Sequence, residues 1–262
     1  MHVDYLPPFV ISLFFLLFVL YYLGLFRFLK LALMSSKKKH MYKSFFAKYF
    51  KYNNELSKKD QDRFVIRANY LIHKIRISGR ENFRVGINEK LFIIAAYVQL
   101  TFGFKRYYLT KFKHFLIYPD AYKNKVTGHM HYGEMNPRGV IVLSWKNLLK
   151  GHIITNDAIN LGLHEMAHAL MYTIINSNEH EKGLDLKLNR VIELSKVEIK
   201  NIKNNTNHLF RDYAKINIYE FFAVSVEHFF ESPIQFKDEL PELYNALSVL
   251  LNQDLAKKSD TD

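Results

Sequence analysis

The chain has 262 residues, of which 49% are hydrophobic and 24% are charged, a balance typical of a globular domain and not of a disordered chain. It contains no cysteine, which excludes disulfides and thiolate ligands, so that a metal site would need histidine and carboxylate ligands. The formal net charge of +12 indicates an anionic surface nearby, either a membrane or a nucleic acid.

The first predicted element is an apolar helix over residues 9–26, which contain no charged residue. With its apolar flanks it reaches the roughly 20 residues that a membrane-spanning helix needs. Lysine and arginine are absent before it and frequent after it. This asymmetry predicts a single-pass transmembrane anchor within residues 1–32, with the N-terminus outside and the rest of the chain in the cytoplasm. A cleaved signal peptide, which usually has positive charge before its apolar core, and a buried core helix are the alternatives.

The lysine-rich residues 35–43 follow this apolar segment directly. Beside a bilayer they would lie among anionic lipid headgroups. Nucleic-acid binding is the alternative, but the chain shows no nucleic-acid-binding motif, so we expect no nucleic-acid partner. Residues 33–262 are expected to form one domain, with a frayed tail at 256–262.

Apolar residues at helical spacing predict that most of this domain is helical. Helices are expected at residues 41–53, 58–75, 90–100, 157–172, 184–203 and 217–231. Asn156 or Asp157 is expected to cap the helix over 157–172, and Asn217 the helix over 217–231.

The middle of the chain predicts strands. Residues 114–119 and 139–145 are short apolar runs bounded by proline or glycine, which favours strands. Residues 129–134 are expected between or beside them, whereas residues 76–85 have a turn-like composition. The expected fold class is therefore α+β, mainly helical, with a small sheet.

The helix over 157–172 carries an H-E-x-x-H pattern. Side chains four residues apart on a helix share a face, so His164 and His168 can present two imidazoles to one Zn²⁺ ion. Glu165 lies on the next face and can act on a water molecule instead of the metal. A helix with two satisfied surface histidines is the alternative.

A third ligand is expected downstream, because a catalytic zinc usually has three protein ligands and one open position for water. Glu220 and Glu227 are seven residues apart in the phenylalanine-rich helix over 217–231 and share a face. Burying two carboxylates on this apolar helix costs free energy unless they contact cations, a metal or the ligands of a metal. We expect Glu220 to be a ligand and Glu227, or His228 beside it, to orient a ligand histidine. A solvated acidic stripe is the alternative.

These motifs together resemble the Mlc titration factor A family of zinc-dependent, glucose-regulated metallopeptidases, which is similar in its catalytic half to the anthrax lethal factor protease domain. The resemblance rests on HEMAHAL, on Tyr213 seven residues before Glu220, and on EFFAVSVEHFFESP. Three further pieces occur in the same order: FLIYPDAY (115–122), GEMNPRGVIVLSW (133–145) and PELYNALSVLLNQD (241–254). It covers roughly residues 85–254.

The resemblance implies a zincin-like metallopeptidase domain of the gluzincin kind. It makes His164, His168 and Glu220 the zinc ligands, one zinc per chain. It also makes Glu165 the general base and Tyr213 the hydroxyl that steadies the oxyanion or protonates the leaving group. The chain departs from the family in one place. Members often carry an acidic residue just after HExxHxL, where this chain has Met171, and the difference bears on activity or metal affinity.

The function expected from the sequence is a membrane-anchored zinc peptidase that acts on a peptide or protein substrate through a zinc-activated water. An edge strand, 139–144 or 129–133, is expected to pair with the substrate backbone. The first alternative is a non-catalytic zinc-containing protein that binds a regulatory partner such as a transcriptional repressor, as the resemblance implies for some members. The second is a basic membrane-surface scaffold without a metal.

Overall fold

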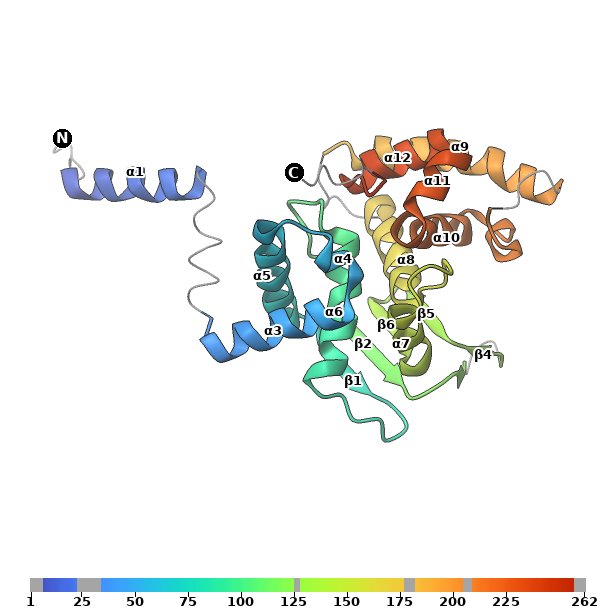
Figure 1. The fold of residues 1–262 in the computed structure, drawn as a ribbon, viewed down its shortest axis with the longest axis horizontal. Helices are drawn as coiled ribbons and strands as arrows, with labels where there is room; N and C mark the ends of the chain where they lie inside the picture. Colours follow the sequence, from blue (N-terminus) through green and yellow to red (C-terminus); the bar gives the residue numbers. More distant parts are fainter. Residues whose placement is uncertain (1–6, 23–33, 125–127, 177–181, 205–208, 257–262) are drawn as a thin grey trace, which may run out of the picture.

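The structure is a computed structural model that describes residues 7–22, 34–124, 128–176, 182–204 and 209–256. Strands from the middle of the chain form a small sheet, and helices from before and after them make up the rest of the described structure (Figure 1). The predicted class, α+β and mainly helical with a small sheet, is confirmed.

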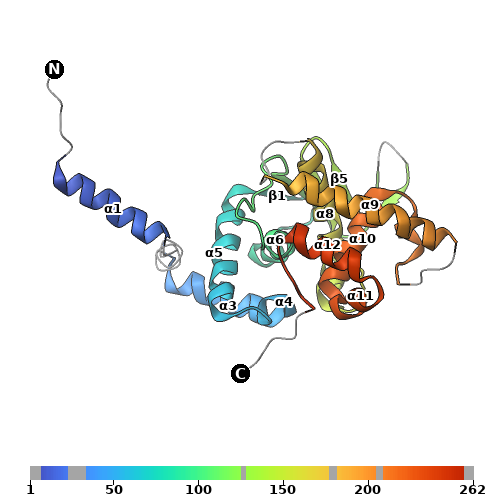
Figure 2. The same ribbon diagram turned by 90° about the horizontal axis from the view of Figure 1, so that it is seen from above.

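The N-terminal helix α1 (Pro8–Tyr22) is apolar and exposed, and Figures 1 and 2 draw it apart from the other helices. Its large apolar residues that are more than half exposed are Phe9, Leu13, Phe14, Phe15, Leu16 and Phe18. Within the described ranges, no helix combines the length and the apolar character needed to cross a bilayer. The predicted transmembrane helix over 9–26 is therefore not confirmed, and residues 23–26 fall outside the described ranges.

Between residue 34 and β2 (His114–Tyr118), the structure describes the helices α3 (Ser36–Tyr49), α4 (Lys51–Asn54), α5 (Lys58–Lys74) and α6 (Ile87–Thr101). The side chain of Ser57 accepts the backbone N–H of Asp60, which explains where α5 begins. Every residue of α6 from Leu91 to Thr101 is buried, so this helix is part of the core, as its uninterrupted apolar sequence predicts.

The main sheet has the strand order β1-β2-β6-β5. Its strands are β1 (Arg76–Gly79), β2 (His114–Tyr118), β5 (Gly133–Asn136) and β6 (Val140–Ser144). The first three in this order are parallel, with Phe115 opposite Ile141, and β5 pairs with β6 in the antiparallel sense. The turn-like interpretation of 76–85 is thus wrong for its first four residues. A separate antiparallel pair consists of β3 (Tyr122–Lys123) and β4 (Met130–His131).

The later helices are α7 (Trp145–Ile153), α8 (Leu161–Asn176), α9 (Leu184–Lys203), the 3-10 turn η1 (Asp212–Lys215), α10 (Ile218–Glu231), α11 (Pro233–Glu239) and α12 (Pro241–Leu251). The prediction for 184–203 matches α9 at both ends, and Asn217 caps α10 as expected. The prediction for α8 is wrong at its start. Asn160, not Asn156 or Asp157, accepts the N–H of Leu163 and caps that helix.

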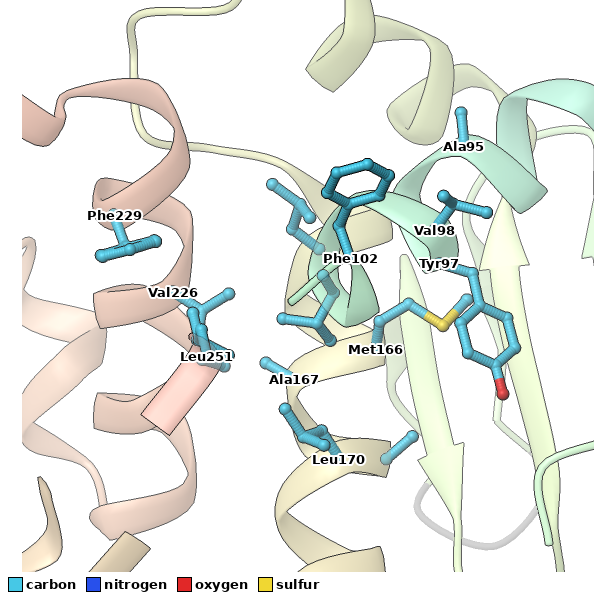
Figure 3. Packing of buried hydrophobic residues seen from close by; sticks show 14 of the residues in the cluster. Ala95, Tyr97, Val98, Phe102, Met166, Ala167, Leu170, Val226, Phe229 and Leu251 are labelled. Carbon is cyan, nitrogen blue, oxygen red and sulfur yellow. The ribbon is translucent and has the colours of Figure 1, made fainter. Parts of the chain in front are cut away.

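Helix α8 lies at the centre of the core (Figure 3). Its residues Met166, Ala167 and Leu170 pack between Val226 of α10 on one side and Tyr97 of α6 on the other. Because most of α8 is buried, its polar side chains must find partners inside the protein. The packing of α8 against α10 therefore determines what faces His164, Glu165 and His168.

The predicted frayed tail, 256–262, falls almost entirely outside the described residues. Its first residue is held in place, because the backbone N–H of Ala256 donates to the Tyr244 hydroxyl at 2.7 Å. The prediction of a frayed tail is therefore wrong for Ala256, and residues 257–262 lie outside the described ranges.

Candidate metal centre

The two motif histidines face each other across one turn of α8. His164 is 7% exposed, and its ring centroid lies 4.7 Å from that of His168. The two Nε2 atoms are 3.2 Å apart. A pair of imidazole nitrogens that converge in this way can bind one cation between them.

Glu220 completes a group of three from the first turn of α10. The Asn217 side chain accepts the N–H of Glu220 at 3.0 Å and so sets where this helix begins. Glu220 Oε2 lies 3.1 Å from His164 Nε2 and 3.5 Å from His168 Nε2. The three ligand atoms all lie within 4.8 Å of one another, and no other such group of three occurs among the described residues.

The electrostatics of this group favour a cation. Burial lowers the pKa of His164, but its hydrogen bonds with Glu220 and Glu227 outweigh burial and raise that pKa to about 10. Burial likewise raises the pKa of Glu220, but the hydrogen bonds from His164 and His168 hold it well below its usual range. The carboxylates thus require a positive charge at this point, which either a proton or a metal ion can supply.

The three ligand atoms fit zinc. Two imidazole nitrogens and one carboxylate oxygen form the ligand set of several catalytic zinc sites. The side chains of His168 and Glu220 are 11% and 18% exposed, so the group is open to solvent on one side. Three protein ligands with an open side leave room for a water molecule or a substrate atom.

Glu165 is buried beside the three candidate ligands. It is 5% exposed, and its Oε2 has no hydrogen-bond partner. Burial raises the pKa of its carboxyl group, and the nearby His164 and His168 oppose that rise. Gly133 of β5 lies against this side chain, since a Cβ at that position would be 2.5 Å from Glu165 Oε1. Only glycine lets the strand approach the carboxylate this closely.

Tyr213, in η1, lies beside His164 and Glu220. It is 45% exposed, and its ring centroid is 6.0 Å from that of His164. Burial, the negative charge of Glu220 and a hydrogen bond to Glu220 raise the pKa of the Tyr213 hydroxyl to about 12. The hydroxyl therefore keeps its proton at neutral pH and can donate a hydrogen bond.

Glu227 contacts His164 through the other ring nitrogen, Nδ1. Its Oε2 lies 3.1 Å from His164 Nδ1, and its Oε1 accepts the backbone N–H of Asn160 at 2.7 Å. Arg211 Nη2 donates to Oε2 at 2.6 Å. A buried carboxylate with these three partners can fix the orientation of the imidazole.

The other two residues singled out from the sequence lie elsewhere. His228 Nδ1 is 3.1 Å from Ser232 Oγ, and its ring packs against that of Phe210 with centroids 4.9 Å apart. The structure thus does not bring His228 to the three candidate ligands. Met171 is 1% exposed within the apolar core, so the departure from the family pattern is accommodated by packing.

Two supporting residues were missed by sequence reasoning. Arg211 precedes Tyr213 by two residues and bridges Glu227 to the carbonyl of Ala158. Asn160 caps α8 and also holds Glu227. The need for a positive partner was predictable, because a buried glutamate on a phenylalanine-rich helix is stable only beside a cation. Nothing in the linear pattern indicates which of the chain's arginines and lysines meets it.

The order of the strands shows which of the two segments predicted to be an edge strand lies at an edge of the sheet. Residues 139–144 correspond to β6, which lies between β2 and β5 and is therefore not an edge. Residues 129–133 contribute β4 to the separate two-stranded sheet and only Gly133 to the main sheet. The described edge of the main sheet beside Glu165 is β5.

A comparison with known families finds one match. The family model described as glucose-regulated metallopeptidase M90 matches residues 30–251. The match includes the three candidate ligands, Glu165 and Tyr213. No curated relative matches the chain.

Proposed function

The chain belongs to the glucose-regulated metallopeptidase family, and from this we propose that it is a zinc-dependent peptidase that hydrolyses peptide bonds in a peptide or protein substrate. One observation carries the proposal. His164, His168 and Glu220 bring three ligand atoms together beside the unpartnered carboxylate oxygen of Glu165. We expect one zinc ion per chain in a zincin-like domain of the gluzincin kind.

The three ligand residues would hold the zinc through His164 Nε2, His168 Nε2 and Glu220 Oε2. When bound, zinc supplies Lewis acidity toward a water molecule and the substrate carbonyl. Glu227 accepts a hydrogen bond from His164 Nδ1. This places the imidazole proton on Nδ1 and leaves the Nε2 lone pair free to bind the metal.

Glu165 is the proposed general base. Its Oε2 has no hydrogen-bond partner in the protein, so it is free to accept the proton of the attacking water. The same oxygen then donates that proton to the nitrogen of the departing amine. The burial of Glu165 keeps competing water away from the carboxylate.

Tyr213 is proposed to donate a hydrogen bond to the negative oxygen that develops on the scissile carbonyl. Its exposure allows contact with a bound substrate, and its hydroxyl keeps its proton at neutral pH. The position of Tyr213 beside Glu220 places the donor next to the candidate metal ligands.

The backbone edge of β5 is proposed to pair with an extended substrate. An added strand gains affinity from main-chain hydrogen bonds and needs an edge free of protein partners. The strand β5 lies at the end of the sheet, and its Gly133 touches Glu165. Pairing along β5 would therefore bring a substrate peptide bond to the general base.

The alternative is a non-catalytic zinc protein that binds a regulatory partner, for example a transcriptional repressor. A zinc ion in such a structural role usually has four protein ligands. The described residues offer three in this group, and Glu165 beside them has the position of a base. These observations favour the peptidase.

Membrane attachment through residues 9–26, with the catalytic domain in the cytoplasm, is a further part of the proposal. It is supported by the absence of charge in that segment, by the basic residues after it, and by the exposed apolar side chains of α1. Flotation of the full chain with phospholipid vesicles tests it. We expect co-flotation that is lost in the variant F14K/F15K; equal flotation of both proteins would contradict attachment by this helix.

The catalytic proposal is tested by the substitution Glu165→Gln in the full-length protein. We expect the variant to keep its zinc and to lose peptide cleavage by about four to six orders of magnitude, since both the base and the acid are removed. Glu193→Gln, which changes an exposed glutamate on α9, is the matched control. Cleavage that survives in Glu165→Gln would exclude Glu165 as the base.

A further inference from the structure

A surface pocket of about 450 Å³ lies between α3 and α5. The two helices lie beside each other in both views (Figures 1 and 2). Its wall consists of Met34, the start of α3, one face of α5 and Tyr107. None of the candidate metal ligands lines it, nor does Glu165 or Tyr213. The pocket is therefore separate from the proposed peptidase centre.

Three basic side chains line this pocket, and no acidic side chain does. They are Lys38 of α3 and His73 and Lys74 of the last turn of α5. His73 and Lys74 are exposed and Lys38 is half-buried, so solvent reaches all three. In the part of the chain that the structure describes, no carboxylate forms an ion pair with Lys38 or Lys74. The protein thus leaves the positive charge of the pocket without a counter-charge.

Lys38 and His73 approach each other although both are basic. They lie 35 residues apart in the chain, and Lys38 Nζ is 3.2 Å from His73 Nε2. An ammonium group can only donate hydrogen bonds, so Nε2 accepts one of its three N–H groups and two remain for a ligand. The oxygens of a phosphate are acceptors that form short, charge-assisted hydrogen bonds with such donors. The arrangement therefore favours an anion in the pocket.

The remaining wall is aromatic. The rings of Tyr70 and Tyr107 meet edge to face, with centroids 5.8 Å apart. The Arg67 guanidinium lies 4.2 Å from the centroid of Tyr107 and donates hydrogen bonds to backbone carbonyls of residues 101–104. Lys74 Nζ lies 5.5 Å from the centroid of Tyr70. These contacts hold the wall in place without a ligand, and tyrosine rings beside basic side chains are typical of the interface between a bilayer and water.

The position of the pocket in the chain relates it to a membrane. Phe26 ends the apolar segment 9–26, and Met34 follows eight residues later, a stretch that spans at most about 29 Å when fully extended. This step rests on the proposed membrane attachment: with residues 9–26 in a bilayer, the pocket lies within that distance of the end of the segment. The helix α3 that begins there has lysines and no acidic residue. Both charge and position therefore favour an anionic headgroup.

We propose that this pocket binds the phosphate-bearing headgroup of an anionic phospholipid and so fixes the domain against the membrane surface. The phosphate lies between Lys38 and Lys74, and the rings of Tyr70 and Tyr107 lie in the interfacial region of the bilayer. The two lysines thereby add a preference for anionic lipid to the apolar contact proposed for α1.

Co-sedimentation of the full-length protein with phosphatidylcholine vesicles that contain or lack phosphatidylserine tests the proposal. We expect the wild type to bind vesicles with phosphatidylserine at least about tenfold more tightly. The variant K38Q/K74Q should lose this preference by about tenfold or more, because each lysine near an anionic surface strengthens binding by about fivefold. It should bind vesicles without phosphatidylserine like the wild type. Raising the salt concentration to about 1 M, where the Debye length is about 3 Å, should also abolish the preference.

The variant K196Q/K200Q is the matched control, because Lys196 and Lys200 are exposed lysines on α9 that do not line the pocket. It removes the same charge as K38Q/K74Q and should keep the wild-type preference. Lys74→Glu, at an exposed position, is a second variant that should reduce the preference, since its carboxylate repels the headgroup. Thermal melts establish that each variant is folded before it is mixed with vesicles.

Three results would overturn the proposal: equal binding of the wild type to both kinds of vesicle, a wild-type preference in K38Q/K74Q, or an equal loss of preference in K196Q/K200Q. Failure of the attachment through α1 alone gives a different result, in which the wild type binds only vesicles that contain phosphatidylserine. A wild type that binds neither kind of vesicle would overturn both the attachment and the headgroup site.

Discussion

Arg211 and Glu227 form an ion pair in which Nη2 donates to Oε2 at 2.6 Å, and that same oxygen lies 3.1 Å from His164 Nδ1. The Glu227 side chain is 1% exposed. The arginine therefore compensates a carboxylate that solvent cannot reach, and the carboxylate in turn orients the histidine. Through these contacts a residue outside the group of three supports the candidate metal site.

The substitution Arg211→Met should lower both the stability of the protein and its affinity for zinc. It leaves the Glu227 carboxylate buried without its cation, which we expect to lower the free energy of unfolding by about 3 kcal/mol. It also loosens the support of His164, which we expect to weaken zinc binding by about 10- to 100-fold. Urea denaturation and competition with a zinc chelator measure the two effects.

Arg190→Met is the control for this prediction. Arg190 is 57% exposed and pairs with Glu242 on the surface at 3.2 Å, an interaction worth less than about 1 kcal/mol. If Arg211→Met changed stability and zinc affinity no more than Arg190→Met does, the proposed support of His164 would be incorrect.

The hydroxyl of Tyr213 should matter for the rate and not for metal binding. In Tyr213→Phe we expect kcat to fall by about 10²-fold, as for the loss of one oxyanion donor, with KM and zinc content unchanged. Steady-state kinetics and elemental analysis provide the measurement. Tyr219→Phe, at an exposed tyrosine of α10, should behave as the wild type. A loss of zinc in Tyr213→Phe would instead indicate a structural role.

Gly133 should not tolerate a side chain. The Cβ of Gly133→Ala would lie 2.5 Å from Glu165 Oε1 and 2.6 Å from Leu161 Cδ1, so β5 or the two side chains must move. We expect a loss of cleavage of about 10-fold or more and a destabilisation of about 1–3 kcal/mol. Gly128→Asn is the control, because open space surrounds Gly128 and asparagine accepts its positive φ. Unchanged cleavage in Gly133→Ala would show that β5 does not need this contact.

Glu231 should make stability depend on pH. Its pKa rises from 4.5 in the unfolded chain to about 7, mainly through burial, with Asp157 and Glu227 adding to the rise and Asn160 opposing it. A raised pKa in the folded state means that this contribution to stability is present below pH 4.5 and is lost as the pH rises toward 7. At pH 8 the loss is on the order of 3 kcal/mol.

The variant Glu231→Gln cannot ionise and should escape this loss. We therefore expect its stability relative to the wild type to increase between pH 4.5 and 7 and to level off above pH 7. Urea denaturation of both proteins across this range is the measurement. A difference between the two proteins that does not change with pH would mean that Glu231 titrates normally.

Much of the helical fold was predictable from the sequence, because long elements carry both an apolar period and end signals. The helix α9 and the cap of α10 at Asn217 are examples. The short strand β1 was missed, since its four residues contain too little pattern and acquire their strand conformation from pairing with β2. The start of α8 was misplaced because several residues near it can cap a helix, and tertiary contacts at Asn160 decide among them.

The candidate site was predictable where its geometry is local. His164 and His168 share a face of one helix, so their meeting follows from spacing alone. The contact of Glu220 with these two histidines depends on how α10 packs against α8, and the spacing of residues in the sequence does not determine that packing. Arg211, Asn160 and Gly133 act through contacts between distant segments, which spacing in the sequence does not encode. His228 was assigned by its proximity to Glu227 in the chain, but it points toward Ser232 instead.

The most direct test of the central claim is anomalous diffraction at the zinc edge from crystals of the zinc-loaded protein. We expect one peak per chain, about 2.0–2.2 Å from His164 Nε2, His168 Nε2 and Glu220 Oε2, with the remaining position open to solvent. A fourth protein ligand at that position would indicate a structural zinc and a binding function. A peak elsewhere, or none in the folded protein, would contradict the proposed metal centre.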